Sequence, residues 1–159
     1  MTATTGIGWD SHRLVAGRPL ILGGVAIEHE LGLDGHSDAD VLTHAIIDAL
    51  LGAAALGDIG QHFPDTDERY RDADSMQLLR TVVATLAERG LAVAHVDATV
   101  VMERPKLAPY RDAIRAALAD GLGVVAEHVN VKASTGEGMG FVGRGEGVAA
   151  LAVATLHSG

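Results

Sequence analysis

The chain of 159 residues contains no cysteine, and its aromatic side chains are limited to one tryptophan, two tyrosines and two phenylalanines. Without cysteine there are no disulfide bonds, no thiolate metal ligands and no thiol nucleophile. With so few rings, aliphatic side chains must fill the core, and a surface that stacks nucleic-acid bases is not expected.

The sequence also lacks segments that would enter a membrane. Its N-terminus has neither the basic nor the apolar region of a signal peptide. The longest apolar run, around residues 148–156, is far shorter than the about 20 residues that span a bilayer. We therefore expect a cytoplasmic protein with no membrane partner.

Positive charge is scarce as well. Twelve basic residues stand against 21 acidic ones, which gives a net charge of −9 at pH 7. This balance argues against a nucleic-acid partner or an anionic lipid surface. An anionic ligand would have to be held by backbone donors, a few basic side chains or bound cations.

Hydrophobic residues make up 48% of the chain, and no repeat or linker interrupts it, so we expect one domain over residues 1–159. Periodicity predicts helices over residues 37–56, 75–89 and 109–121. Strands are predicted over residues 4–12, 20–27, 93–102, 129–133 and 148–156, the last being either a strand or a buried helix and favoured as a strand by its valines. Gly23-Gly24 marks a bulge or turn, and Gly6 and Gly8 allow another backbone to approach closely.

This order of elements predicts an α+β fold, a single domain with a mixed β-sheet and helices layered on one face. The strands are rich in alanine and valine with little polar alternation, which indicates burial on both faces. Three helices cover only one face. The protein is therefore expected to form an oligomer through the other side of the sheet.

Three residues have the chemistry of a metal site. Asp10 and His12 alternate on a predicted strand, so both side chains leave the same face, and zinc prefers such nitrogen and oxygen ligands. His44 is the best third ligand, because Asp40 and Asp48 lie one helical turn on either side and either could orient its imidazole. The alternative is ordinary, since an Asp-x-His pair or a helical histidine more often binds no metal.

A glycine-rich tract over residues 134–147 is the second feature. Ser134, Thr135 and the backbone N–H groups of such a turn can bind an anion. Glu137 would repel a phosphate unless a divalent cation such as Mg²⁺ lay between them. The alternative is a mobile surface loop with no ligand.

Two further groups of polar residues remain ambiguous. Arg144 and Glu146 form either an exposed charge pair or, with glycine on both sides, a cluster of copies around a symmetry axis. Asp58 and Asp65 are ordinary turn residues when judged alone.

Five motifs stand in a characteristic order: GIGWDSH, HSDADVLTHAIIDALLGAAALGDIG, FPDTD, NVKASTGE and GFVGRGEG. From Gly6 to the last strand, the chain resembles the 2-C-methyl-D-erythritol 2,4-cyclodiphosphate synthase family of the non-mevalonate isoprenoid pathway. Two departures are visible. Ala39 stands where the family usually has glycine, and Gly136 stands where it usually has a hydroxyl or similar side chain.

The resemblance implies a phosphorus–oxygen lyase with two cations. Asp10, His12 and His44 would bind Zn²⁺, and Glu137 would hold Mg²⁺ or Mn²⁺ at a diphosphate. The substrate would be 4-diphosphocytidyl-2-C-methyl-D-erythritol 2-phosphate, whose own 2-phosphate attacks the β-phosphorus and releases CMP. Because the nucleophile is already an oxyanion, neither a general base nor a covalent enzyme intermediate is needed.

The resemblance also implies a set of site residues and an assembly. Catalysis would involve His36, Asp58, Thr135 and Glu137. Substrate contacts would come from Asp48, Asp58, Gly60, Asp65, Met102, Pro105, Lys106, Leu107, Ser134, Thr135, Phe141 and Arg144. Members of the family are homotrimers with active sites between subunits, and some bind an isoprenoid diphosphate in a central cavity, here near Arg144 and Glu146.

Two rival functions share these residues. A zinc hydrolase would use the same three ligands but would direct water at an external bond. A non-enzymatic trimeric module would sense isoprenoid diphosphates through Arg144.

Overall fold

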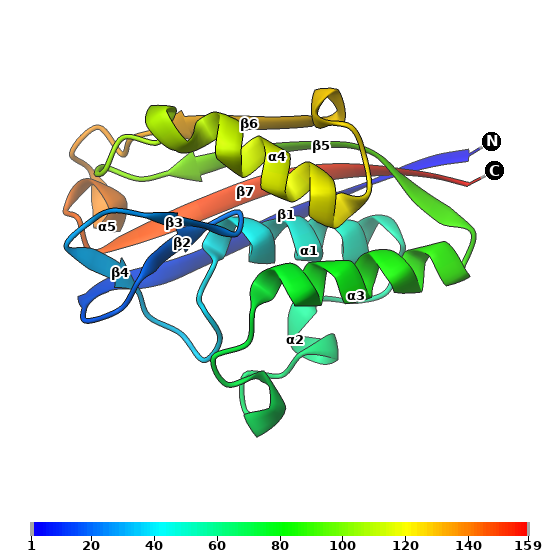
Figure 1. Cartoon of the computed structure of the whole chain (residues 1–159), viewed down its shortest axis with the longest axis horizontal. Helices are drawn as coiled ribbons and strands as arrows, with labels where there is room; N and C mark the ends of the chain where they lie inside the picture. The colour runs from blue at the N-terminus through cyan, green and yellow to red at the C-terminus, as the bar shows by residue number, and fades with distance from the viewer. Residues whose placement is uncertain (1, 159) are drawn as a thin grey trace.

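A computed structural model describes residues 2–158, and a mixed five-stranded sheet forms one layer of the fold (Figure 1). Along the sheet, the strand order is β4-β1-β7-β5-β6. Only β5 and β6 run parallel. The sheet comprises β1 (Thr2–Ala16), β4 (Leu31–Leu33), β5 (Leu91–Val101), β6 (Val129–Ser134) and β7 (Gly147–Ser158). The mixed sheet is as predicted, and its last strand is indeed a strand.

Three helices cover one face of this sheet, as expected (Figure 1). They are α1 (Val41–Ala53), α3 (Ser75–Glu88) and α4 (Arg111–Leu122). The α1 helix lies against β1 and β7 and is buried on nearly every side. The α3 helix packs against α1 and β5, and α4 packs against α3 and β6. One continuous apolar core joins helices and sheet, so the α+β single-domain prediction is confirmed.

Several short elements differ from the prediction. Residues 20–27 form a two-stranded sheet of their own, β2 (Leu20–Leu22) and β3 (Val25–Ile27), because Gly23 and Gly24 turn the chain with positive φ angles. A third short strand, β4, was not predicted. The loop over residues 57–71 and the glycine-rich tract also contain regular turns: α2 (Ile59–His62), the 3₁₀ helix η1 (Glu68–Tyr70) and α5 (Gly140–Gly143). Two more 3₁₀ helices flank α4, η2 (Ala108–Tyr110) and η3 (Ala126–His128).

The predicted helix over residues 37–56 is too long at both ends. Its N-cap is Asp40, whose side chain accepts from the Thr43 N–H at 3.0 Å, rather than Ser37 or Asp38. Ala39 has φ +56°, a left-handed conformation that a helix cannot contain and that glycine adopts more readily than alanine. At the other end, Ala55 has φ +58°, so the helix stops at Ala53.

The opposite face of the sheet is open in the single chain. Ile7 and Trp9 of β1 are 66% and 55% exposed, and Leu151 and Val153 of β7 are each 39% exposed. These four residues pair across the two strands, Ile7 with Val153 and Trp9 with Leu151. Burial on both faces is therefore not found within one chain. Among residues 2–158, no helix combines the length and the apolar character needed to cross a bilayer.

Candidate metal centre and active site

The predicted metal ligands come together where α1 crosses β1. Asp10 and His12 project from the same face of β1, and His44 projects from the first turns of α1 toward them. The two backbones touch because Gly6 and Gly8 present no side chain to α1: a Cβ on either would overlap a carbonyl oxygen of the helix. One ligand atom from each of the three residues lies within 4.8 Å of the others, so they form a group that could hold a metal ion.

The hydrogen bonds of the three residues show which of their atoms have lone pairs that could bind a cation. The Nδ1 of His12 lies 2.8 Å from the Asp34 carbonyl oxygen, which can only accept, so Nδ1 carries the hydrogen and Nε2 of the neutral ring has the lone pair. That Nε2 lies 2.8 Å from the Asp10 Oδ2 and 3.4 Å from the Nδ1 of His44. The Nδ1 of His44 lies 3.1 Å from the same Oδ2. Electron-rich atoms thus converge on one point, as a bound cation requires.

The pKa values of Asp10 and His12 are both shifted by their proximity to one another. Burial works to raise the pKa of Asp10, but hydrogen bonds and charge from the two imidazoles hold it below its usual range. Burial works to lower the pKa of His12, but the Asp10 carboxylate raises it above that of an ordinary histidine. Both shifts favour the charged forms, so the Asp10 carboxylate and a protonated His12 stabilise each other.

The side chains that contact His44 are not the predicted ones. Asp40 is fully buried and accepts from the N–H groups of Gly23 and Gly24, and Asp48 accepts from the Ile59 N–H at 3.1 Å. Neither therefore orients the imidazole, and that prediction is wrong. The Nε2 of His44 instead faces the hydroxyl of Ser75, at 2.7 Å.

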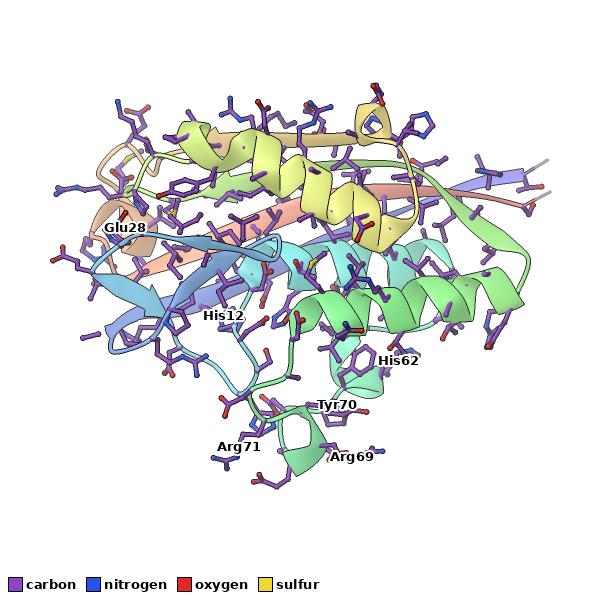
Figure 2. The ribbon with its side chains drawn as sticks, viewed as in Figure 1. His12, Glu28, His62, Arg69, Tyr70 and Arg71 are labelled. Atoms are coloured by element: carbon purple, nitrogen blue, oxygen red, sulfur yellow. The ribbon has the colours of Figure 1, made fainter. Side chains whose placement is uncertain are left out.

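A cavity of about 470 Å³ opens beside the three candidate ligands. Figure 2 shows His12 near the start of α1 and the segment with Arg69, Tyr70 and Arg71 below α3; His12 and Tyr70 both line the cavity. His36 reaches the cavity and is held by a contact of 2.7 Å between its Nε2 and the Asp67 carbonyl oxygen. The cavity is lined by Asp10, His12, Gly35, His36, Ser37, His44, Ile59, Gly60, Phe63, Pro64, Asp65, Tyr70 and Leu78.

Asp58 is held at the rim of the same region. It caps α2, accepting from the Gln61 N–H at 3.0 Å, while the Gln61 side chain accepts from the Asp58 N–H. Its neighbours Ile59 and Gly60 line the cavity. The N–H of Ile59 also donates to Asp48, which ties α2 to α1. Of the predicted residues, His36, Gly60 and Asp65 thus line the cavity beside the three candidate ligands, whereas Asp48 and Asp58 bond to the neighbouring helix α2 and do not line it.

The remaining predicted residues gather at the ends of β5 and β6. The Met102 N–H donates to the Ser134 carbonyl oxygen at 2.9 Å, and the Met102 and Leu107 side chains are buried. Pro105 follows a cis peptide bond, and Lys106 and Thr135 are exposed. None of the residues over 102–107 or 134–137 lines the cavity beside the metal ligands. Within one chain, the predicted site is therefore in two parts.

Glu137 projects from a tight turn in the second part. Its φ is +54°, and its N–H donates to the Thr135 hydroxyl at 3.2 Å. The preceding Gly136 is closely packed: a Cβ there would lie 2.8 Å from the Met139 carbonyl oxygen, and its N–H donates to the Glu103 carboxylate. Glycine at this position thus fits the tight packing of the turn.

Phe141 and Arg144 lie beyond this turn. Phe141 lines a second hollow of about 210 Å³ on the side of His12 and Arg13. Arg144 pairs with Glu146 through Nε and Oε1 at 2.9 Å, both side chains being exposed. The reading of these two as a surface charge pair holds for the single chain.

Sequence reasoning did not find Ser75, because no local pattern links residue 75 to His44. Phe63, Pro64 and Tyr70 were also missed as cavity-lining residues. The FPDTD motif was the only signal near them.

Comparisons with known proteins identify the family of the chain. The YgbB family matches residues 3–157. The chain belongs to the YgbB family. A curated relative, 2-C-methyl-D-erythritol 2,4-cyclodiphosphate synthase of Salinibacter ruber, is 61% identical over 153 residues, which cover 96% of this chain and 98% of that protein.

Solved structures match this member of the YgbB family closely. A structure of 2C-methyl-D-erythritol-2,4-cyclodiphosphate synthase in a CDP-bound form is 38% identical with a TM-score of 0.88, covering 96% of this chain and 99% of its own. The bifunctional IspDF of Campylobacter jejuni is 42% identical with a TM-score of 0.96; the match covers 99% of this chain and 43% of that one.

Proposed function

We propose that this protein converts 4-diphosphocytidyl-2-C-methyl-D-erythritol 2-phosphate to 2-C-methyl-D-erythritol 2,4-cyclodiphosphate and CMP, in non-mevalonate isoprenoid biosynthesis. The observation that carries the proposal is the convergence of Asp10, His12 and His44 on one cavity. It occurs in a chain that is 61% identical to an enzyme of this name. In the reaction, a 2-phosphate oxygen bonds to the β-phosphorus, and CMP leaves with the oxygen that bridged the two phosphorus atoms.

Two cation sites follow from the donor sets. Asp10, His12 and His44 fit Zn²⁺, since they provide one oxygen and two nitrogen ligands. Glu137 is the candidate ligand for Mg²⁺ or Mn²⁺, which prefer carboxylate and phosphate oxygens. When bound, these cations would offset the repulsion between the reacting phosphates in a protein of charge −9.

The residues around the cavity would bind the methylerythritol end of the substrate. Asp58 is held in place by its capping box and presents a carboxylate that can accept from hydroxyl groups. Asp48, Gly60 and Asp65 complete this side, and His36, fixed at Asp67, would cover the substrate. Holding both ends of one molecule in a reactive geometry can supply roughly 7–11 kcal/mol of the barrier.

The ends of β5 and β6 would bind the cytidine diphosphate end. Backbone groups over residues 102–107, with Pro105 and Lys106, would read the cytosine edges without a stacking ring. Ser134 and Thr135 would donate to the diphosphate through their hydroxyls, next to Glu137. A CDP-bound structure among the relatives supports a cytidine-linked ligand.

The separation of the two parts supports a homotrimer in which neighbouring subunits complete each site. The open sheet face with Ile7, Trp9, Leu151 and Val153 provides an apolar surface for the assembly. Phe141 and the Arg144–Glu146 pair would then lie toward the axis, where an isoprenoid diphosphate could bind.

The experiment mixes protein, Mg²⁺ and the cytidyl substrate and follows the products by ³¹P NMR. Cyclodiphosphate with an equal amount of CMP supports the proposal. A linear, hydrolysed product would favour a zinc hydrolase, and no turnover at all would favour a binding module. The Asp10→Asn variant is the matched control, because it removes a proposed ligand without changing the size of the side chain.

A further inference from the structure

A chain of hydrogen bonds leads away from the side of His44 that faces the protein interior. The Nε2 of His44 lies 2.7 Å from the hydroxyl oxygen of Ser75, the first residue of α3, which is fully buried. The Ser75 hydroxyl in turn donates to the Asp38 carboxylate, and the Ser75 N–H donates to the same carboxylate at 2.9 Å. Asp38, Ser75 and His44 are thus linked in series.

The direction of these bonds follows from the hydrogens available. An ionised carboxylate can only accept, so the single hydrogen of the Ser75 hydroxyl is given to Asp38. Ser75 can then offer only a lone pair to His44, so the Nε2 of His44 must carry a hydrogen. A neutral imidazole has one N–H, which leaves the lone pair on Nδ1, the atom 3.1 Å from the Asp10 Oδ2.

We propose that Asp38 and Ser75 are positioning residues that keep Nε2 of His44 protonated and aim its Nδ1 lone pair at Asp10 and His12. The proposal rests on the metal site of the proposed function. It assigns to two residues of the chain the choice of which imidazole nitrogen binds the ion, a choice that a free histidine side chain leaves open.

The surrounding backbone keeps this chain in place. The Asp38 N–H donates to the Ala73 carbonyl oxygen at 3.1 Å, and the Asp40 N–H donates to the Asp38 Oδ1 at 3.1 Å. The segment before α1 is therefore attached to the segment before α3. Both helices that contribute to the chain are fixed relative to each other at their first turns.

Ser37 is the other hydroxyl near Nε2, and it is the weaker partner. Its oxygen lies 3.3 Å from Nε2, beyond the usual range, and it accepts from the Ala39 N–H at 3.2 Å. Ser75 is both closer and directed by a carboxylate. The orientation of His44 is therefore assigned to Ser75.

The first test measures Zn²⁺ affinity by competition with a chromophoric chelator, with no substrate present. Loss of a hydrogen-bond partner behind a metal-bound histidine typically weakens metal binding 10–100-fold. We expect that range for Ser75→Ala. Thr81→Ala is the matched control, because it also removes one hydroxyl from α3, one that bonds only to the Gln77 carbonyl oxygen of its own helix. Its affinity should stay within about twofold of the wild type. Equal affinities in Ser75→Ala and Thr81→Ala would overturn the proposal.

The second test needs no variant. ¹⁵N NMR of the Zn²⁺-loaded wild type should show His44 bound through Nδ1, with an Nε2 hydrogen that exchanges slowly with water. Zn²⁺ on Nε2, or rapid exchange of that hydrogen, would overturn the proposal even if Ser75→Ala failed to fold. A wild type that binds Zn²⁺ through Nδ1 but forms no cyclodiphosphate would contradict the proposed function and leave this inference standing.

Discussion

Gly8 of β1 lies directly against the carbonyl of Ala45 in α1, so strand and helix meet backbone to backbone next to the metal ligands. A Cβ at Gly8 would overlap that oxygen and lie 2.7 Å from the Ala49 nitrogen. Backbone atoms cannot move aside as a flexible side chain can. The distance between Asp10 or His12 on the strand and His44 on the helix therefore depends on this glycine.

We expect Gly8→Ala to separate α1 from β1. Overpacking of this kind typically costs about 1–3 kcal/mol of unfolding free energy. Zn²⁺ affinity should fall in the same variant, because the ligands come from both elements. Urea denaturation and chelator competition measure the two effects.

Gly52→Ala is the control, since Gly52 lies in α1 and a Cβ there would meet nothing closer than 3.8 Å. Alanine inside a helix should raise stability by about 0.5–1 kcal/mol over glycine. A Gly8→Ala protein as stable as Gly52→Ala would show that the close contact is not required.

Prediction from the sequence worked where local periodicity and packing agree. The helices over residues 75–89 and 109–121 and the strands around residues 4–12 and 93–102 were placed within a few residues, because each has a regular apolar face. The start of α1 was misplaced, because Asp40 caps the helix by accepting from the Thr43 N–H. The same carboxylate is held by the N–H groups of Gly23 and Gly24, a turn that is distant in the sequence.

The candidate site shows the same contrast between features set by local sequence and features set by distant contacts. Asp10 and His12 share a strand face, so their proximity could be predicted, and His44 was the one histidine on a long buried helix. Its orientation could not be predicted. It depends on Ser75, 31 residues away, whose position is set by how α3 packs against α1.

Removing a metal ligand should abolish both metal binding and turnover while leaving the fold intact. His12→Ala and Asp10→Asn each alter one of the three proposed ligands. We expect the Zn²⁺ affinity to fall by more than the roughly 100-fold typical of losing a residue that only hydrogen-bonds to a ligand. Zinc content by atomic spectroscopy and far-UV circular dichroism check the two statements. If either variant loses its folded structure, the metal ion has a structural role instead.

As the pH is lowered, the affinity for the metal ion should begin to fall at a higher pH than in a site with an ordinary histidine. The pKa of His12 is raised, so protons begin to occupy its Nε2 at a higher pH, while the lowered pKa of Asp10 keeps that carboxylate charged. Zn²⁺ competition titrations between pH 5.5 and 8, a range on the order of one unit or more either side of an ordinary histidine pKa, measure this. An affinity that does not change over this range would contradict the assignment of His12 as a ligand.

In the metal-free protein, protonation of His12 has the opposite effect: it stabilises the fold instead of competing with a metal ion. The raised pKa of His12 means that its contribution to stability is complete below about 6.5 and is lost as the pH rises through the folded-state pKa. For Asp10, with a lowered pKa, the contribution is present above about 3.9 and is lost as the pH falls through its folded-state pKa. The melting temperature of the chelator-treated protein should therefore be highest between these two pH values.

Glu137→Gln should weaken the dependence of turnover on Mg²⁺ without affecting Zn²⁺ binding. The amide keeps the size of the side chain but removes the charge that holds a hard cation. We expect the Mg²⁺ concentration for half-maximal activity to rise at least about tenfold, as for loss of about 1.4 kcal/mol of binding free energy. Glu127→Gln, on the exposed turn η3, is the control, and an unchanged Mg²⁺ dependence in Glu137→Gln would rule out its assigned role.

Trp9→Glu should convert the assembled protein to monomers. Trp9 lies opposite Leu151 on the open sheet face, and a carboxylate there would lose its hydration on assembly without gaining a partner. Light scattering after size exclusion should give a mass near 16.4 kDa for the variant and three times this value for the wild type. Val125→Glu alters an apolar residue that is 58% exposed between α4 and η3, outside that face, and should remain trimeric. A trimeric Trp9→Glu protein would show that this face is not the contact between subunits.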